Sequence, residues 1–177
     1  MVITTKTGDK GKTSLCRGKR VAKDSLRIEI CGILDELNSY LGISKSLTKD
    51  IKLKQIVESI QKDLFIIGAE VATEARHRKQ LKVRIDNKFI ERLEELIEQL
   101  EESSICSSFC FCLPGANPVS SSLDVSRALA RKLERRIVTL KRKKFINNDF
   151  VLIYLNRLSD LLFLFARKTT KKFSKKK

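Results

Sequence analysis

Apolar residues recur at steps of three and four along most of this 177-residue chain, and that spacing predicts amphipathic helices rather than strands. The segment 103–117 interrupts the pattern with two serine pairs and Pro114-Gly115, and Pro118 follows it, so it is expected to be a loop. Helices are predicted to begin near Ile28, Asp50, Asp86, Pro118 and Asn147 or Asn148. Five such helices with short connections predict an all-α, antiparallel five-helix bundle over 28–168, preceded by a glycine-containing arm at 1–27.

The charge is strongly positive, with 37 Lys and Arg against 21 Asp and Glu. Much of the excess lies in the arm and in a lysine-rich tail at 169–177, which is expected to be disordered. No apolar run is long enough to span a membrane, and the N-terminus does not resemble a secretory signal. Five cysteines, an odd number, fit a reducing environment. A single domain in the cytoplasm is therefore expected.

The arm combines the residue types that bind phosphate. Thr5–Leu15 holds glycines whose amides can approach an anion closely, together with hydroxyl groups and lysines. Gly11-Lys12-Thr13 resembles the end of a P-loop, but the first glycine of that motif would fall at position 6, which is Lys6. A P-loop nucleotidase is therefore excluded. A basic hairpin turn at Gly8-Asp9 remains the alternative.

A polar sector of the fourth predicted helix is a second candidate site. Arg127, Arg131, Glu134 and Arg135 fall within about 100° of one another when residues advance by about 100° each. Asn156 interrupts the aliphatic face of the fifth helix, where its amide needs partners if it is covered. The alternative for these charges is an ordinary solvated face with ion pairs between helical turns.

Other chemistries find less support in the sequence. Cys106, Cys110 and Cys112 do not have the spacing of a structural zinc site, and His77 is the single histidine. A hydrolase triad is not expected either, because the one histidine has no serine or cysteine nucleophile signature near it. A basic helical protein could bind nucleic acid through Lys141–Lys144 and Lys171–Lys177, but no tryptophan and no base-reading motif accompany them. Nucleic acid is therefore not the expected partner.

Five segments in sequence resemble the propanediol-utilisation-type (PduO-type) ATP:cob(I)alamin adenosyltransferases, also called corrinoid adenosyltransferases. They are Thr5–Leu15, Gly32–Asn38, Phe111–Gly115, Arg131–Arg135 and Tyr154–Asp160. The resemblance covers nearly the whole of a single domain at 1–168. It implies a helical bundle that forms a homotrimer, with ATP sites between subunits. The implied reaction transfers the 5′-deoxyadenosyl group of ATP to reduced corrinoid and releases triphosphate.

The resemblance also implies roles for individual residues. Asp35 and Arg127 would form an ion pair between subunits, and Phe111 would cover the lower face of the corrin. Arg131, Glu134, Arg135 and Asn156 would hold the rest of ATP and its leaving phosphates. The residues implied around the triphosphate are Thr5, Lys6, Thr7, Gly8, Thr13, Ser14 and Lys23. Asp35, Phe111, Arg127 and Arg131 would form the catalytic set, and Mg²⁺ would be bound mainly through ATP, with no side-chain metal ligand assigned.

A corrinoid reductase and a B12-dependent enzyme would be the further partners of such a transferase. Besides the nucleic-acid-binding alternative, a trimeric protein that binds nucleotide or corrinoid without turnover would use the same residues.

Overall fold

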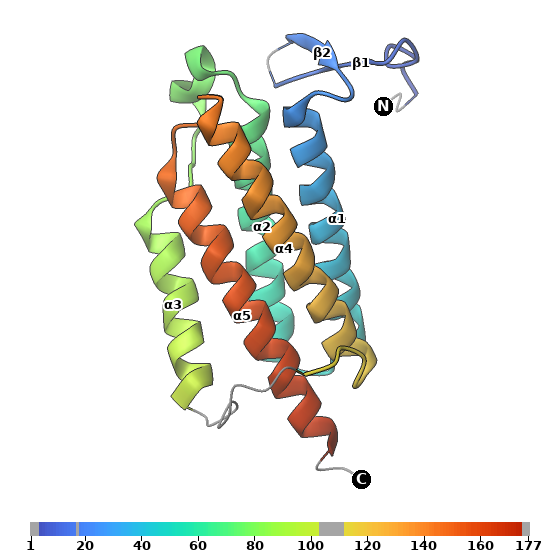
Figure 1. Ribbon diagram of the computed structural model, residues 1–177, viewed down its shortest axis with the longest axis vertical. Coiled ribbons are helices and arrows are strands. Elements are labelled where there is room, and N and C mark those ends of the chain that lie inside the picture. The colour runs from blue at the N-terminus through green and yellow to red at the C-terminus, as the bar shows by residue number, and fades with distance from the viewer. Residues whose placement is uncertain (1–3, 17, 103–111, 175–177) are drawn as a thin grey trace.

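The computed structural model describes residues 4–16, 18–102 and 112–174 of the chain. These residues form five long α-helices, a two-stranded antiparallel sheet and one 3₁₀ helix, η1 (Figure 1). The elements in chain order are β1 (Lys12–Ser14), β2 (Arg20–Ala22), α1 (Leu26–Leu47), α2 (Ile51–Ala72), η1 (Ala75–Gln80), α3 (Asn87–Glu102), α4 (Pro118–Arg142) and α5 (Asp149–Ser174). The predicted fold class is therefore confirmed as far as a predominantly helical bundle.

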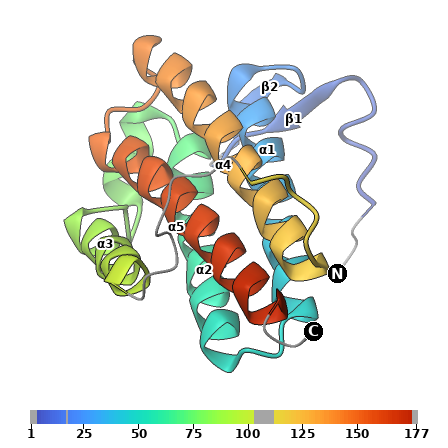
Figure 2. The same ribbon diagram turned by 60° about the horizontal axis from the view of Figure 1, so that its bottom comes forward.

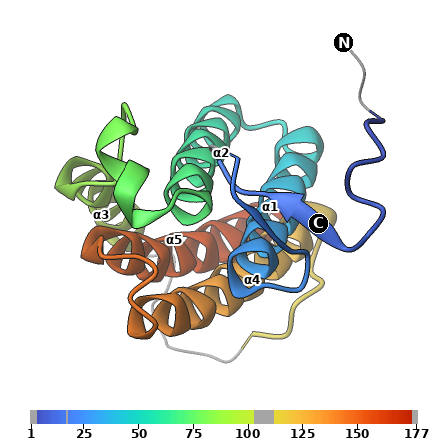
Figure 3. The same ribbon diagram turned by 90° about the horizontal axis from the view of Figure 1, so that it is seen from above.

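The helices pack side by side, with α4 between α1 and α5 (Figure 3). α2 packs against the other side of α1, and α3 packs against α5. The predicted apolar stripes all face this interior: Ile30, Leu37 and Leu41 of α1, Val57, Ile60 and Ile67 of α2, and Leu133 and Ile137 of α4 are at most 1% exposed. Because burying one such side chain contributes about 1.5–3 kcal/mol, these stripes stabilise the bundle.

Polar residues next to the starts of α2 and α4 fix where these two helices begin. The Asp50 side chain accepts a hydrogen bond from the Leu53 amide at 3.2 Å, as expected for the predicted cap of α2. Asn117 and Ser120 form a reciprocal capping box before Pro118, so the predicted start of α4 is confirmed. The predicted starts of α3 and α5 are confirmed within one or two residues.

Two of the buried carboxylates, both on α2, have several partners each. Asp63 of α2 accepts a hydrogen bond from the Tyr154 hydroxyl at 2.6 Å and pairs with Arg92 of α3. Glu70 accepts hydrogen bonds from the Ile85 amide at 2.9 Å and from Asn148, and it pairs with Arg84 at 3.1 Å. These contacts connect α2 to α3, to α5 and to the segments between helices, so they fix how the helices sit relative to one another.

The charged sequence between Thr73 and Arg84 predicts an exposed helix end and a loop, and the structure differs from this prediction. Thr73 and Arg78 are buried there, at 1% and 7% exposure. The Arg78 guanidinium donates to the Phe145 carbonyl and to Asn147 Oδ1, and thereby satisfies acceptors in the turn between α4 and α5. Periodicity does not reveal this because the partner turn is almost seventy residues away in the chain.

Two further differences concern the ends of the chain. The arm contains the β1–β2 hairpin, whose closing turn lies at residues 15–19 rather than at Gly8-Asp9; the Leu15 amide donates to the Lys19 carbonyl at 2.8 Å. Residues 7–10 do form a turn, but it precedes β1. At the other end, α5 continues to Ser174, beyond the boundary at 168.

Candidate functional site

The arm is ordered around the guanidinium group of Arg20 on β2. This group donates to the Thr7 carbonyl at 2.6 Å and to the Lys12 carbonyl at 3.1 Å, and it reaches Ser14 Oγ at 3.5 Å. The hydroxyl oxygens of Thr5 and Thr7 lie 3.0 Å apart. Several residues predicted to wrap a triphosphate are thus gathered around one side chain, and Thr5, Thr7 and Ser14 remain exposed.

Gly8 and Lys23, both predicted to bind triphosphate, lie next to each other. A Cβ atom placed on Gly8 would lie 3.1 Å from Lys23 Nζ. The Lys23 amide donates to the Gly11 carbonyl at 2.9 Å, which joins the end of β2 to the turn before β1. Thr13 faces Val21 in the sheet, so it belongs to the same small unit. The absence of a side chain at Gly8 leaves room for the Lys23 ammonium group there.

The hairpin is attached to one end of the bundle by contacts with the end of α2 (Figure 1). The Cys16 amide donates to the Ala72 carbonyl at 3.1 Å, and Lys19 pairs with Glu74 at 2.7 Å. The hydrogen bond from Lys19 lowers the pKa of Glu74. Arg27, at the start of α1, donates to the Val71 carbonyl and to the Phe145 carbonyl, and its burial lowers its pKa. These contacts fix the position of the arm relative to the end of the bundle.

The polar sector of α4 meets α5 as the sequence suggested. Asn156 Nδ2 donates to Glu134 Oε1 at 3.3 Å, and Arg157 donates to Asn156 Oδ1 at 2.9 Å. Arg157 is held in turn by Glu94 of α3 at 2.8 Å, and this hydrogen bond raises the pKa of Arg157. Arg131 and Arg135 are exposed, and no ion pair occupies either within the described chain. Two cationic groups therefore flank a fixed Glu–Asn pair.

Asp35 and Arg127 are not brought together within one chain. Asp35 is exposed on α1, at the rim of a shallow groove of about 480 Å³ that also includes Asn38, Gln61 and Phe65. Arg127 lies on α4, where its Nε is 3.8 Å from Asp124 Oδ1. No ion pair of Asp35 is formed inside the part of the chain that the structure describes. Phe111, the remaining predicted catalytic residue, lies outside the described residues.

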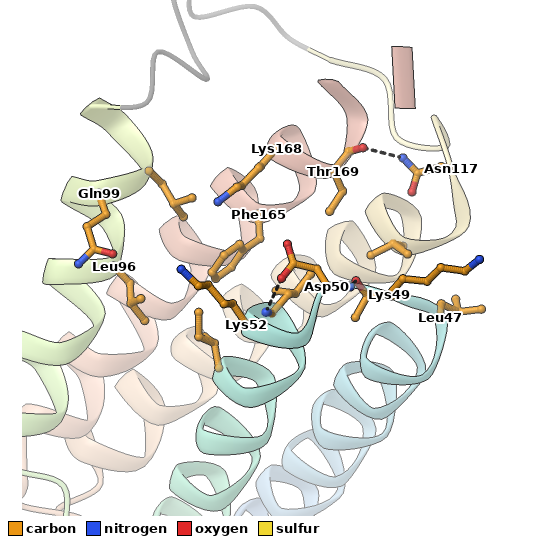
Figure 4. A pocket seen from close by; sticks show the side chains of 15 residues that line it. Leu47, Lys49, Asp50, Lys52, Leu96, Gln99, Asn117, Phe165, Lys168 and Thr169 are labelled. Carbon is orange, nitrogen blue, oxygen red and sulfur yellow. Dashed lines mark hydrogen bonds between the residues drawn. The ribbon is translucent and has the colours of Figure 1, made fainter. Parts of the chain in front are cut away.

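A larger pocket, of about 790 Å³, opens at the end of the bundle opposite the arm, and the sequence does not predict it (Figure 4). Figure 2 turns this end of the bundle toward the viewer. The apolar lining of the pocket includes Leu53, Leu96 and Phe165, while Lys52 and Lys168 lie near its edge. The pocket is formed by the ends of α1, α3 and α5 and the starts of α2 and α4. No sequence signal marks it, because its lining comes from five separate segments.

Among the described residues, no three His, Cys, Asp or Glu side chains cluster closely enough to hold a metal ion. None of the described helices has the length and apolar character to cross a membrane. The three cysteines in this part of the chain, Cys16, Cys31 and Cys112, are unpaired.

Comparisons with known proteins agree with one another. The sequence model of the cobalamin adenosyltransferase family matches residues 3–169. A corrinoid adenosyltransferase of Citrobacter freundii is 40% identical over 166 residues, which are 93% of this chain and 93% of that protein. A corrinoid adenosyltransferase PduO of Salmonella typhimurium is 38% identical over 94% of this chain, but the chain spans only 49% of that longer protein.

A solved structure shares the fold. It is a variant of the PduO-type ATP:corrinoid adenosyltransferase from Lactobacillus reuteri complexed with cobalamin and ATP, in which a phenylalanine is replaced by alanine. It superposes with a TM-score of 0.88 at 35% identity, covering 98% of this chain and 96% of that one.

Proposed function

The chain belongs to the cobalamin adenosyltransferase family, and from this membership we propose that it transfers the 5′-deoxyadenosyl group of ATP to a reduced corrinoid. The observation that carries this function is the likeness of 98% of the chain to an adenosyltransferase complexed with cobalamin and ATP. In the reaction, the electron pair of cobalt(I) forms a bond to C5′ of ATP. The bond between C5′ and the phosphate oxygen breaks, and triphosphate leaves with its electron pair.

Cobalt(I) is itself a strong nucleophile, so this reaction needs no general base. The protein has to orient C5′ toward cobalt and to stabilise the negative charge of the departing triphosphate. Both tasks suit a site made of arginine, lysine and backbone amides, and these are the groups that the arm and the polar face of α4 present.

The arm is proposed to hold the triphosphate. The exposed hydroxyls of Thr5, Thr7 and Ser14 can donate to phosphate oxygens, and the Lys23 ammonium group beside Gly8 supplies positive charge. Lys6 and Thr13 complete this set. Mg²⁺ is proposed to enter on the triphosphate, because phosphate oxygens and water are ligands that it prefers.

The face shared by α4 and α5 is proposed to hold the rest of ATP. Arg131 and Arg135 carry charges that no acidic side chain of the described chain neutralises, so they are available to an anionic ligand. Glu134 and Asn156 are already held by one another and by Arg157, which gives their remaining hydrogen-bonding capacity a fixed direction. Fixed donors and acceptors are what orientation of the nucleoside requires.

A homotrimer is proposed as the active assembly. α1 exposes an apolar stripe of Tyr40, Ile43 and Leu47, and α4 exposes Val125; each is 38–45% exposed in the single chain. An assembly would cover such a stripe. Asp35, which forms no ion pair with the described residues of its own chain, would meet Arg127 of a neighbouring copy. Phe111 would exclude an axial ligand from the lower face of cobalt, which makes cobalt(II) easier to reduce.

Turnover with Mg-ATP and chemically reduced cobalamin tests the function. We expect the absorption spectrum of a photolabile cobalt–carbon product. Arg131→Ala should lower kcat by about 10²–10³-fold, the cost of removing a donor that stabilises developing charge. Arg142→Ala, an exposed arginine at the far end of the same helix, is the matched control and should keep full activity. Normal ATP binding without any product would favour the non-catalytic alternative.

A charge exchange tests the contact between copies. Asp35→Arg and Arg127→Asp should each weaken the trimer in light scattering and raise KM for the corrinoid. The double variant should recover much of both losses, because the opposite charges are restored in exchanged positions. Losses that simply add in the double variant would contradict the proposed ion pair.

Phe111→Ala should reduce activity that starts from cobalt(II) more than activity that starts from cobalt(I).

A further inference from the structure

One buried carboxylate lies between two arginines where α4 meets the end of α5. Asp124 is 6% exposed, and it accepts a hydrogen bond at Oδ2 from the guanidinium of Arg167, which is 7% exposed. The other oxygen, Oδ1, lies 3.8 Å from Nε of Arg127. The cluster therefore contains two positive charges and one negative charge. Such an imbalance is costly in a covered position unless another anion completes it.

The position of this carboxylate is fixed from several sides. The Arg167 guanidinium lies 5.4 Å from the centre of the Phe163 ring on the same helix, an arrangement that favours the cation. The end of α5 is joined to the start of α4, since Asn117 Nδ2 donates to the Thr169 carbonyl at 3.3 Å (Figure 4). Ser122 of α4 also bonds to Ser44 of α1 at 2.8 Å. Asp124 therefore cannot turn far from its two arginines.

Arg127 differs from Arg167 in being only partly covered. Its side chain is 31% exposed, although its Nε atom is buried and forms no hydrogen bond within the described residues. The exposed area therefore belongs to the other atoms of the side chain. Asp124 thus faces the inner edge of this guanidinium, and the outer part can meet a neighbouring molecule.

We propose that Asp124 and Arg167 are positioning residues for Arg127. Arg167 donates to one oxygen of the Asp124 carboxylate, and the other oxygen faces Arg127. Asp124 therefore orients the Arg127 guanidinium but neutralises its charge only in part. The remaining charge is directed out of α4, toward Asp35 of a neighbouring copy. This inference rests on the proposed role of Arg127 and adds two residues that act through it, from within the same chain.

The test is a comparison of KM values in the full-length trimer. Asp124→Asn should raise KM for the corrinoid by about 10- to 100-fold, the range expected when a site residue is displaced by about 1 Å. KM for ATP should change less than about twofold, since the nucleotide contacts lie further along α4 and on α5. Arg167→Met should also raise the corrinoid KM, because Asp124 is then free to pair fully with Arg127. It serves as the second variant if Asp124→Asn folds poorly.

Two comparisons separate positioning from a loss of stability. Asp63→Asn removes another buried, ion-paired carboxylate, between α2, α3 and α5, and should lower the unfolding temperature without altering the corrinoid KM. In an Arg127→Ala background, Asp124→Asn should add nothing to the corrinoid KM. A full additional increase in that background would overturn the positioning role. If Arg127→Ala alone leaves the corrinoid KM unchanged, the proposed function of Arg127 fails, and the inference fails with it.

Discussion

Replacing Gly8 with alanine tests whether the Lys23 ammonium group lies on the triphosphate. The new Cβ would be 3.1 Å from Lys23 Nζ and 3.3 Å from its Cε, so the end of the lysine must move by a few tenths of an ångström. Moving a unit charge from about 3.0 to about 3.4 Å from a phosphate oxygen costs about 0.6 kcal/mol at an effective dielectric constant of about 20. We therefore expect KM for ATP to rise about threefold, as 0.6 kcal/mol is close to RT.

Lys23→Ala sets the upper limit for this effect. Losing a hydrogen bond to a charged group costs about 1.5–3 kcal/mol, or about 10- to 150-fold in KM for ATP. Steady-state kinetics at saturating corrinoid would measure both changes. Gly68→Ala is the matched control: its Cβ would meet Leu34 at an ordinary 3.8 Å, so KM should not change. If Lys23→Ala leaves KM for ATP unaltered, Lys23 does not contact the triphosphate and the reasoning is refuted.

Three further predictions concern the interior. Tyr154→Phe removes the hydrogen bond to Asp63, which should cost about 1.5–3 kcal/mol of stability. The calorimetric unfolding temperature should therefore fall by about 3–12 °C. An unchanged unfolding temperature would mean that the Asp63 carboxylate does not need this donor. Burial raises the pKa of Asp63, so its stabilising contribution is complete below the unfolded pKa of 3.8 and is lost as pH rises through the folded pKa. The stability advantage of the wild type over Asp63→Asn should therefore shrink in chemical unfolding as the pH rises above 3.8, and an advantage that grows with pH would contradict this. Burial also raises the pKa of the Cys31 thiol, so iodoacetamide should label Cys31 more slowly than the exposed Cys16 in mass spectrometry; equal rates would be inconsistent with that burial.

Part of the candidate site could be predicted because it is local in sequence. Arg131, Glu134 and Arg135 share a helix face at any tertiary arrangement, since helical geometry fixes the spacing of side chains three and four apart. Asn156 was singled out as a polar interruption in an apolar stripe, and the structure places it 3.3 Å from Glu134. Their resemblance to a known family then supplied roles that the pattern alone did not.

Other parts could not be predicted because their partners are distant in the chain. Asp124 pairs with Arg167, which lies more than forty residues later, so helical spacing does not connect the two. Arg78 lies in the charged segment 73–84, whose sequence predicts exposure, yet it binds the turn between α4 and α5. The pocket of about 790 Å³ is lined by five segments, none of which is distinctive by itself.

The amino-acid sequence by itself determined the five helices, the capped starts of α2 and α4 and the apolar face of each helix. These features depend on contacts within one or two helical turns, so a linear pattern is sufficient to specify them. Only the tertiary structure decided which charges are buried, which pair with one another and how Arg20 orders the arm. Those outcomes depend on which helix faces meet, because a charge loses its water, or finds a partner, only when another element covers it.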